Sequence, residues 1–177
     1  MQNGFYTIRL ADGRETAMPS LQYGEIFYNR REQLTWQKDE EGYCLTDADK
    51  LIYRFTQEKN ADGFQMLSSV SNSSGFSVTF RYNHKGLLTQ ITDSCSRLLE
   101  VENDELGHIL RIYTHACGRE INLVQYAYDA AGNLSKTIDT EGAEKYFYYD
   151  DHLMIKLTNQ SGMSFYWEYE GKGDNAK

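Results

Sequence analysis

The sequence predicts an all-β fold, built as a curved antiparallel β-sheet strip. The 177 residues contain 14 Gly but a single Pro, which indicates that Gly with Asp or Asn makes the turns, as in β-hairpins. Short aromatic and apolar segments recur with a turn about every ten residues, which is typical of all-β chains. No stretch keeps an apolar period of about 3.6 residues, so we expect helix to be close to absent.

A repeated unit is clearest at 126–134, which reads Tyr-Ala-Tyr-Asp-Ala-Ala-Gly-Asn-Leu. Residues two apart on a strand share a face, so Tyr126 and Tyr128 should point the same way. Asp129 then begins a turn by accepting a backbone hydrogen bond, and Gly132 supplies the positive φ that the turn requires. Each unit predicts two short strands and two tight turns. The predicted turn residues are Asp129, Gly132, Asp139, Gly142, Asp150 and Gly162.

Copies of the unit follow one another along the second half of the chain. Their Asn, Asp or Glu anchors stand at positions 83, 104, 129, 150 and 170, which are 21, 25, 21 and 20 residues apart. The longer step contains His115-Ala-Cys-Gly118, which we interpret as a second turn displaced by inserted residues. Asn83 replaces Asp, and Ser96 and Leu153 each replace Gly. Asn and Ser still favour turns, whereas Leu153 predicts a different, looser turn after Asp150.

Residues 1–79 show the same alternation of strands and turns without the strict unit. A strand at 6–10 precedes an Asp-Gly turn, and a strand at 33–37 precedes an acidic turn at 39–42. We expect about six strands in this lead-in region. The repeat region follows at 80–177, and no Ser- or Pro-rich linker separates the two regions. One continuous sheet is therefore expected.

The units at 126–142 and 147–162 resemble the YD repeats of the Rhs and teneurin families. The lead-in resembles the stretch that precedes the repeats in bacterial Rhs proteins, through Tyr28-Asn-Arg-Arg, Thr46-Asp-Ala-Asp and Phe80-Arg-Tyr82-Asn83. Together these segments cover residues 12–173, nearly the whole chain. Several units in register make the resemblance much more specific than a single unit would.

This resemblance implies an architecture and a function. In that family the repeats wind as a β-sheet strip into a hollow shell, or cocoon, that encloses a C-terminal toxin. Many members leave bacteria by type VI or other contact-dependent secretion, and others form insecticidal toxin complexes. The chain is then expected to be a non-catalytic structural segment of the shell that encloses or scaffolds the cargo of a bacterial secreted polymorphic toxin. The family's self-cleavage motif is of the DPxG type and Pro19 is the only proline, so no catalytic residue is carried over.

The charge balance argues against a nucleic-acid partner, because 18 Lys and Arg against 26 Asp and Glu give a net charge of −8. No apolar run is long enough to span a membrane, and the first ten residues do not resemble a signal peptide. We expect the bacterial cytoplasm before export, or secretion without a classical signal peptide. Cys44, Cys95 and Cys117 are odd in number and lack CxxC spacing, which predicts free thiols.

The recurring aromatic residues have two interpretations. As structure, they would form ladders between adjacent strands, where cross-strand pairs stabilise a sheet by about 0.2–1 kcal/mol each. As a site, they would form a face that binds carbohydrate or a partner protein through its rings. This binding module is the alternative function. Its residues would be Tyr126, Tyr128, Phe147, Tyr149, Trp167 and Tyr169.

Other candidate sites are weaker. The segment Asp47-Ala-Asp49 lacks the further ligands of a calcium loop. The acid pairs Glu40-Glu41 and Asp150-Asp151 lie in exposed turns, where nothing would separate their pKa values for hydrolysis. No histidines have metal-ligand spacing, and a dyad of His115 and Cys117 in a turn would be a chance arrangement. The sequence predicts no enzyme, no cofactor and no metal site. A hydrolase with two carboxylates in a cleft is a third hypothesis.

The last unit, at 167–173, stops partway through a repeat, and the tail at 174–177 is polar and short, which indicates truncation. Terminal repeats normally need caps, because a sheet edge exposes unpaired backbone groups. We expect the C-terminal edge to pair with the remainder of an Rhs-like shell or with another copy of the chain. The expected partners are the remainder of the shell or the toxin cargo polypeptide. The net charge of −8 opposes such self-association.

Overall fold

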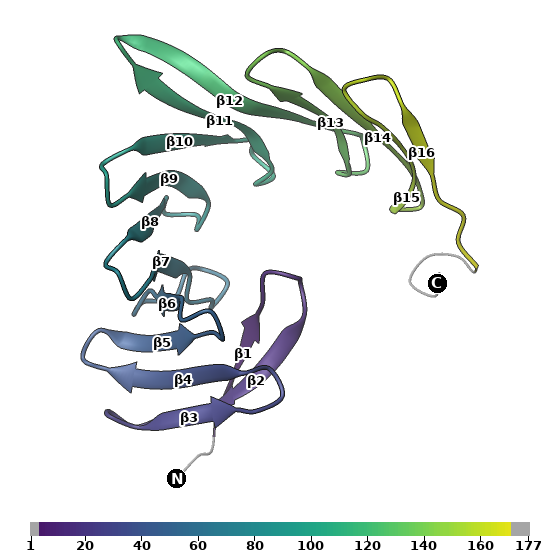
Figure 1. Cartoon of the computed structure of the whole chain (residues 1–177). Coiled ribbons are helices and arrows are strands. Elements are labelled where there is room, and N and C mark those ends of the chain that lie inside the picture. Colours follow the sequence, from purple (N-terminus) through teal and green to yellow (C-terminus); the bar gives the residue numbers. More distant parts are fainter. Residues whose placement is uncertain (1–3, 171–177) are drawn as a thin grey trace. The chain divides into compact units, whose positions relative to one another are not determined.

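The computed structural model describes residues 4–170, and within this range it contains sixteen strands and no helix (Figure 1). The last predicted unit, at 167–173, thus lies partly outside the described residues. The tail at 174–177 lies wholly outside them. The chain divides into two compact units, Met1–Arg97 and Leu98–Lys177. The first unit holds β1 (Phe5–Arg9), β2 (Glu15–Pro19), β3 (Ile26–Asn29), β4 (Leu34–Asp39), β5 (Gly42–Thr46), β6 (Ile52–Phe55), β7 (Leu67–Ser71), β8 (Ser77–Tyr82) and β9 (Leu88–Asp93).

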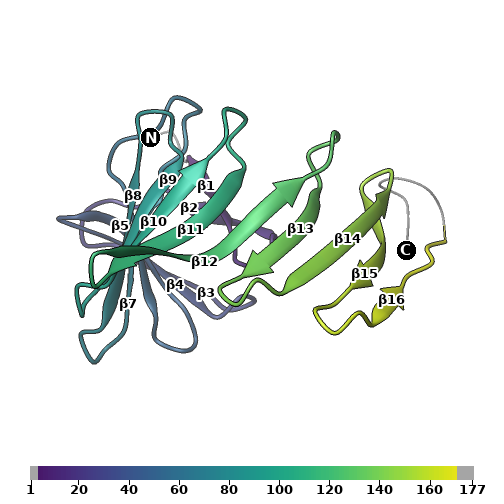
Figure 2. The same ribbon diagram turned by 90° about the horizontal axis from the view of Figure 1, so that it is seen from above.

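The second unit holds seven strands, and all strand pairs in the two units are antiparallel pairs of chain neighbours. In the first unit β1 and β2 form a separate hairpin, while β3 to β9 follow in order. Figure 2 shows successive strands of that unit rotated relative to one another, the twist expected of antiparallel sheets. The predicted all-β antiparallel strip is confirmed. The strands of the second unit are β10 (Leu98–Asn103), β11 (Ile109–Ala116), β12 (Arg119–Tyr128), β13 (Leu134–Asp139), β14 (Glu144–Asp150), β15 (Leu153–Thr158) and β16 (Ser164–Tyr166).

Seven strands, β1 to β7, precede β8, where about six were expected. The strand with the weakest sequence signal is β7, which reads LSSVS and carries three serines. Serine has little intrinsic preference for strands, so the position of this strand is set by pairing with its neighbours.

The hydrophobic core of the first unit lies under the β1–β2 hairpin. Met18 of β2 is fully buried and Trp36 of β4 is only 2% exposed. The Trp36 ring stacks on Tyr43 of β5 with centroids 4.6 Å apart, and its Nε1 donates to the Pro19 carbonyl at 3.0 Å. The hairpin therefore packs on β4 and β5 and covers one face of them. The buried residues are Ile8, Met18, Leu21, Leu34, Trp36, Tyr43 and Leu45.

The predicted turns are built as the unit suggests. The Asp129 carboxylate accepts backbone N–H bonds from Ala131 and Asn133, both at 2.9 Å, and Gly132 has a φ of +84°. Asp139 and Asn159 make the same pattern two and four residues on. Ser96 adopts the left-handed conformation that Gly takes elsewhere, with a φ of +63°.

A β-bulge follows the turns at Asn83 and Asp129, whereas the hairpins that turn at Asp139 and Asn159 have none. In β12, Ala127 pairs with Lys136 but Tyr128 pairs with Leu134, so Ser135 is an extra residue in β13. The register shifts in the same way at Tyr82 and Leu88. Because the extra residue lies in the second strand, the first strand keeps its regular alternation of faces. The sequence did not reveal these bulges.

Two turns differ from the unit. Asp150 pairs directly with Leu153, and the two residues between them, Asp151 and His152, have φ values of +47° and +66°. This is a two-residue hairpin turn, so the expectation of a looser turn is wrong, and Asp150 ends β14 instead of capping a turn. The long step in the repeat has a similar two-residue turn at Cys117 and Gly118. The inserted residues lengthen β11 and β12 to 8 and 10 residues.

Candidate binding surface

Four of the predicted aromatic residues share one face of the second unit. Tyr126 of β12 pairs with Thr137 of β13, which pairs in turn with Lys145 of β14. Directly paired residues lie on one face, and alternate residues of a regular strand do too. We name this side the YD face. It carries Tyr126, Tyr128, Phe147 and Tyr149.

These rings do not form the expected aromatic ladders. Within residues 4–170, no ring of the YD face contacts another ring of that face. The repeat places the aromatic residues on β12 and β14, with β13 between them, so the rings are separated by about 10 Å. Phe147 instead lies opposite Leu157, and Leu157 lies opposite Phe165 of β16. This row across β14, β15 and β16 therefore alternates aromatic and aliphatic side chains.

The tyrosine before three of the five anchors has a role that the sequence did not show. The Tyr128 hydroxyl donates to the Ile109 carbonyl at 2.9 Å. Tyr169 donates to Met154 at 2.9 Å, and Tyr82 of the first unit donates to the carbonyl of Leu67 at 2.8 Å. The accepting carbonyls lie at the beginning of the neighbouring strand, where a bulge disturbs the ladder. These hydroxyls thus satisfy backbone acceptors, which explains Tyr in place of Phe at this position.

The half-buried Tyr128 also packs against an acid–histidine pair. His108 stacks on its ring with centroids 4.5 Å apart, and His108 Nδ1 lies 2.9 Å from the Asp104 carboxylate. This hydrogen bond holds the pKa of Asp104 below its ordinary value. Burial raises the pKa of Tyr128, helped by the neighbouring Tyr126 and Asp104. Tyr128 is accordingly a neutral, structural side chain.

Trp167 and Tyr169 follow the end of β16. Trp167 donates its backbone N–H to the Ile155 carbonyl at 3.0 Å and leaves 40% of its surface exposed. Among the six predicted binding residues, Trp167 is exposed and the other five are partly buried. The predicted binding surface thus presents one open ring beside five that pack within the sheet.

The opposite face carries a second set of aromatic residues that the sequence reasoning missed. Lys156 of β15 pairs with Tyr148 of β14 and with Tyr166 of β16, and its ammonium lies 4.8 Å and 5.6 Å from their ring centres. The ammonium of Lys136 lies 5.8 Å from the Tyr146 ring. We name this set the Tyr–Lys row. It comprises Lys136, Tyr146, Tyr148, Lys156 and Tyr166.

The Tyr–Lys row is more open to solvent than the YD face. Tyr148 is 43% exposed and Tyr166 is 70% exposed. Lys136 forms an ion pair with Glu144 at 2.8 Å, which lowers the pKa of Glu144 and raises that of Lys136. The alternation of Lys and Tyr across β13 to β16 could have revealed this row, but it lies outside the repeat pattern that drew attention to the other face.

The remaining candidate residues do not assemble into a reactive site. Glu41 is paired with Arg54 at 3.2 Å, and Glu40 accepts a hydrogen bond from Tyr23 at 3.1 Å. His115 packs on Tyr113 with ring centroids 5.8 Å apart. Within residues 4–170, no three His, Cys, Asp or Glu residues are grouped to hold a metal ion. The predicted free thiols are confirmed, with Cys44 buried and Cys95 and Cys117 exposed.

The consecutive hairpins and their in-register turns define a β-repeat protein. No protein-family model matches the chain. The curated double-stranded DNA deaminase toxin A of Burkholderia cenocepacia (strain H111) is 28% identical over 167 residues. The alignment covers 89% of this chain and 11% of that toxin, so the chain spans about a ninth of the relative's length. The chain is therefore similar in sequence to part of a bacterial toxin.

Two solved structures are among those that match the chain. One is TcdB2-TccC3 without its hypervariable C-terminal region, with a TM-score of 0.48 and 11% identity. The other is the Photorhabdus luminescens Tc holotoxin pore carrying a TccC3 mutation, with a TM-score of 0.49 and 10% identity. The matches cover 94% and 96% of this chain and 11% of each of those chains. No helix long and apolar enough to cross a membrane occurs in the described part of the chain.

Proposed function

We propose that the chain is a non-catalytic structural segment of an Rhs/YD-repeat shell, which encloses or scaffolds the toxin cargo of a bacterial secreted polymorphic toxin. Its partners would be the remaining shell and the cargo polypeptide. Synthesis in the cytoplasm and export without a classical signal peptide, for instance by a type VI route, belong to the same proposal. The similarity to a toxin over 89% of the chain supports it.

The observation that carries the proposal is a pair of open, apolar sheet edges. Among residues 4–170, β3 of the first unit pairs only with β4, and its Ile26 and Tyr28 are 65% and 54% exposed. In the same described range, β16 of the second unit pairs only with β15, and Tyr166 is 70% exposed. Edge strands of complete proteins are usually protected by Lys, Pro or covering segments. Within residues 4–170, neither strand contains Lys or Pro, as expected for strands that continue into more sheet.

The chain does not carry the residues of a zinc deaminase. Such enzymes hold zinc with His and Cys in H-x-E and P-C-x-x-C motifs, with the Glu as general acid and base. The 177 residues contain neither motif. We expect the purified chain to leave cytosine in double-stranded DNA unchanged. Zinc-dependent deamination by the chain would contradict the non-catalytic assignment.

A chimera tests the structural role. The aligned region of the Burkholderia cenocepacia toxin is replaced by this chain, so that the flanking parts supply strands to both edges. We expect a folded chimera in which the joined region resists limited proteolysis. In β16 the bond from Trp167 N to Ile155 O sets the ladder so that the Tyr166 N–H points outward.

The matched variant is Tyr166→Pro, which removes this outward donor and leaves the β15 ladder intact. It should make the chimera protease-sensitive, while the isolated chain carrying the same change keeps its circular dichroism spectrum. A Tyr166→Pro chimera as resistant as its parent would contradict edge pairing at β16.

The alternative function is a carbohydrate- or protein-binding module. The exposed Trp167 supports it, because an open ring can stack on a sugar. Low-micromolar binding on a glycan array that is abolished by Trp167→Ala would favour this function. A flat array with the wild-type chain would count against carbohydrate binding.

A further inference from the structure

Within residues 4–170, one edge of the β1–β2 hairpin in the first unit has no strand beside it. Ser20 N donates to the Gly4 carbonyl at 2.9 Å, and Leu10 N donates to the Arg14 carbonyl at 2.8 Å. These bonds lie at the two ends of the hairpin ladder. Antiparallel ladders bond at every second residue, so the intervening backbone groups of β1 point away from β2. They belong to Phe5, Thr7 and Arg9.

The outer edge of β2 differs at its C-terminal end, where Pro19 and Leu21 have partners. Pro19 has no N–H, and its carbonyl accepts the 3.0 Å bond from Trp36 Nε1. Beyond it, Leu21 exchanges backbone hydrogen bonds with the Tyr43 hydroxyl at 3.1 Å and 3.2 Å. Within residues 4–170 no comparable group meets the outward backbone of β1. In the described range, the outward backbone of β1 is therefore open along the whole strand, whereas that of β2 is occupied at Pro19.

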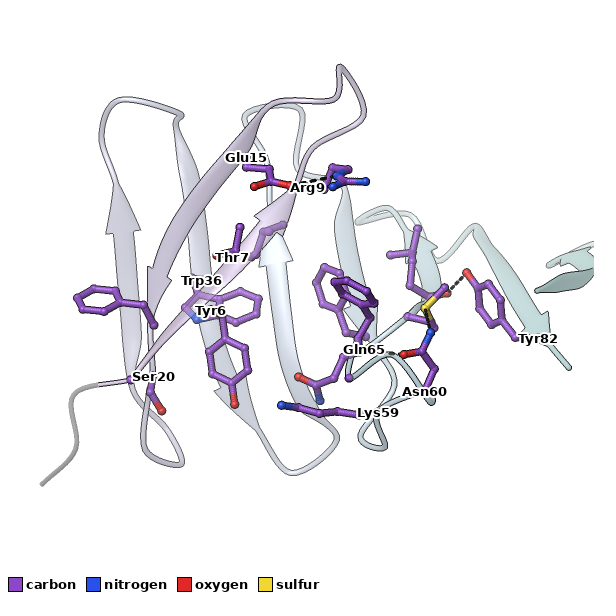
Figure 3. Close-up of a pocket in the computed structure, with 18 residues that line it drawn as sticks. Tyr6, Thr7, Arg9, Glu15, Ser20, Trp36, Lys59, Asn60, Gln65 and Tyr82 are labelled. Carbon is purple, nitrogen blue, oxygen red and sulfur yellow. Dashed lines mark hydrogen bonds and ion pairs between the residues drawn. The ribbon is translucent and has the colours of Figure 1, made fainter. Parts of the chain in front are cut away.

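This open edge borders a groove of about 800 Å³ (Figure 3). Every residue of β1 lines it, including side chains from both faces of the strand, so the groove runs along the strand edge. The segment 59–67 lines the groove too, and Figure 3 shows Lys59, Asn60 and Gln65 there. Trp36 and Phe55 also contribute to its lining. The groove thus combines free backbone groups with apolar rings.

We propose that this groove binds an extended polypeptide segment, which adds a strand to β1. The segment would exchange main-chain hydrogen bonds with Thr7 and its outward neighbours, and alternate side chains would enter the apolar part of the groove. The five residues of β1 match a segment of about five residues, or about 17 Å. This proposal goes beyond the shell function, and its failure would leave that function standing.

The charges in the groove define one feature of the segment. Arg9 is paired with Glu15 at 2.9 Å. Lys59 is exposed, lines the groove and forms no ion pair within the described residues. An acidic side chain on the bound segment would pair with Lys59. The partner is therefore an extended segment with alternating apolar residues and a carboxylate near one end.

Amide hydrogen exchange on the isotope-labelled full chain tests the proposal. The probe is an eight-residue peptide of alternating Val and Thr with one Glu at an end and both termini blocked. At saturation we expect exchange at Thr7 to slow by about tenfold or more, since a new main-chain bond protects the amide. The same peptide methylated at every backbone nitrogen should have no effect, and a peptide with Lys in place of Glu should bind more weakly.

Two variants complete the test. Thr7→Pro removes an outward N–H and should weaken peptide binding about tenfold, while Tyr166→Pro, on an edge strand of the other unit, should not. Phe64→Ser alters a 64% exposed groove residue and should weaken binding severalfold even if Thr7→Pro proves unstable. Unchanged exchange at Thr7, protection confined to β3 or β16, or equal binding of the methylated peptide would overturn the proposal.

Discussion

At the residue scale, single side chains complete the backbone hydrogen bonding of the sheet. The Tyr128 hydroxyl meets the Ile109 carbonyl next to a bulge, while the hydroxyl of Tyr126, on the same face, has no hydrogen-bond partner within residues 4–170. The two tyrosines of one repeat therefore differ in role. One completes a backbone acceptor, and the other contributes its apolar ring.

Replacing Tyr128 by Phe removes only that hydroxyl. We expect the free energy of unfolding to fall by about 1 kcal/mol, because the half-buried carbonyl loses its donor. Tyr126→Phe is the matched control and should change stability by less than about 0.5 kcal/mol. Urea denaturation of the two variants checks the difference, and equal losses would contradict the assigned role of the Tyr128 hydroxyl.

The turn carboxylates make stability depend on pH. The Asn133 side chain, together with backbone N–H groups, lowers the pKa of Asp129 below its ordinary value of 3.8. The folded state therefore favours the ionised form, and this stabilisation is complete above about pH 4. It is lost as the pH falls further, through the lowered folded-state pKa.

Asp129→Asn should keep the turn at neutral pH, since Asn159 makes the same turn, but lose less stability than the wild type on acidification. Denaturation midpoints at about pH 6 and about pH 2.5 measure this difference. Asp150→Asn is the control, because the Asp150 carboxylate accepts no hydrogen bond in the described part of the chain. If Asp129→Asn lost as much stability on acidification as the wild type, the assigned role of the Asp129 carboxylate would be contradicted.

At the element scale, the hairpins depend on turn chemistry and on bulges. The sequence predicted the turns, because Asp129 and Gly132 are turn-forming residues whose effect is local, within four residues. It did not predict the bulge at Ser135, since an extra residue becomes visible only when two strands are paired. The turn after Asp150 was misjudged for a related reason: Leu153 resumes the strand early, and Asp151 and His152 take up the positive φ that Gly provides elsewhere.

The YD face and the Tyr–Lys row differ in the same way: a sequence pattern predicts the first, whereas the second depends on strand pairing. Tyr126 and Phe147 were found because they repeat, and the shared face followed from strand alternation. The Tyr–Lys row was missed because the pairing of Lys156 with Tyr148 and Tyr166 depends on register. The open edge of β1 could not be predicted either, since it follows from a hairpin that pairs with no further strand among residues 4–170.

Gly142 tests the turn geometry without steric interference. Its φ is +81°, and a Cβ added there would meet no atom within 4 Å. Gly142→Ala should therefore lower stability by about 1 kcal/mol through backbone strain alone. Gly142→Asn should cost less, because Asn tolerates the left-handed region. Thermal or urea denaturation distinguishes the two, and equal costs would contradict this account of the turn.

At the scale of the whole molecule, the two units differ in how they bury apolar surface. The first unit has a core in which Met18 and Trp36 are almost fully buried. In the second unit Val101 is the one buried apolar residue within the described range, at 7% exposure, and aromatic rings lie exposed on its last strands. A sheet with so little buried apolar surface becomes more stable when neighbouring strands or chains cover its faces and edges.

The central claim is that the chain is a segment of a β-sheet shell, whose open edges pair with strands outside it. Its most direct test is the mass of the purified 20.5 kDa chain by size exclusion with light scattering, over a range of concentrations and with circular dichroism alongside. The account predicts a β-rich chain whose mass rises with concentration, and whose association is reduced by Tyr166→Pro. A β-rich monomer at every concentration would show that the chain satisfies its own edges, and would contradict the claim.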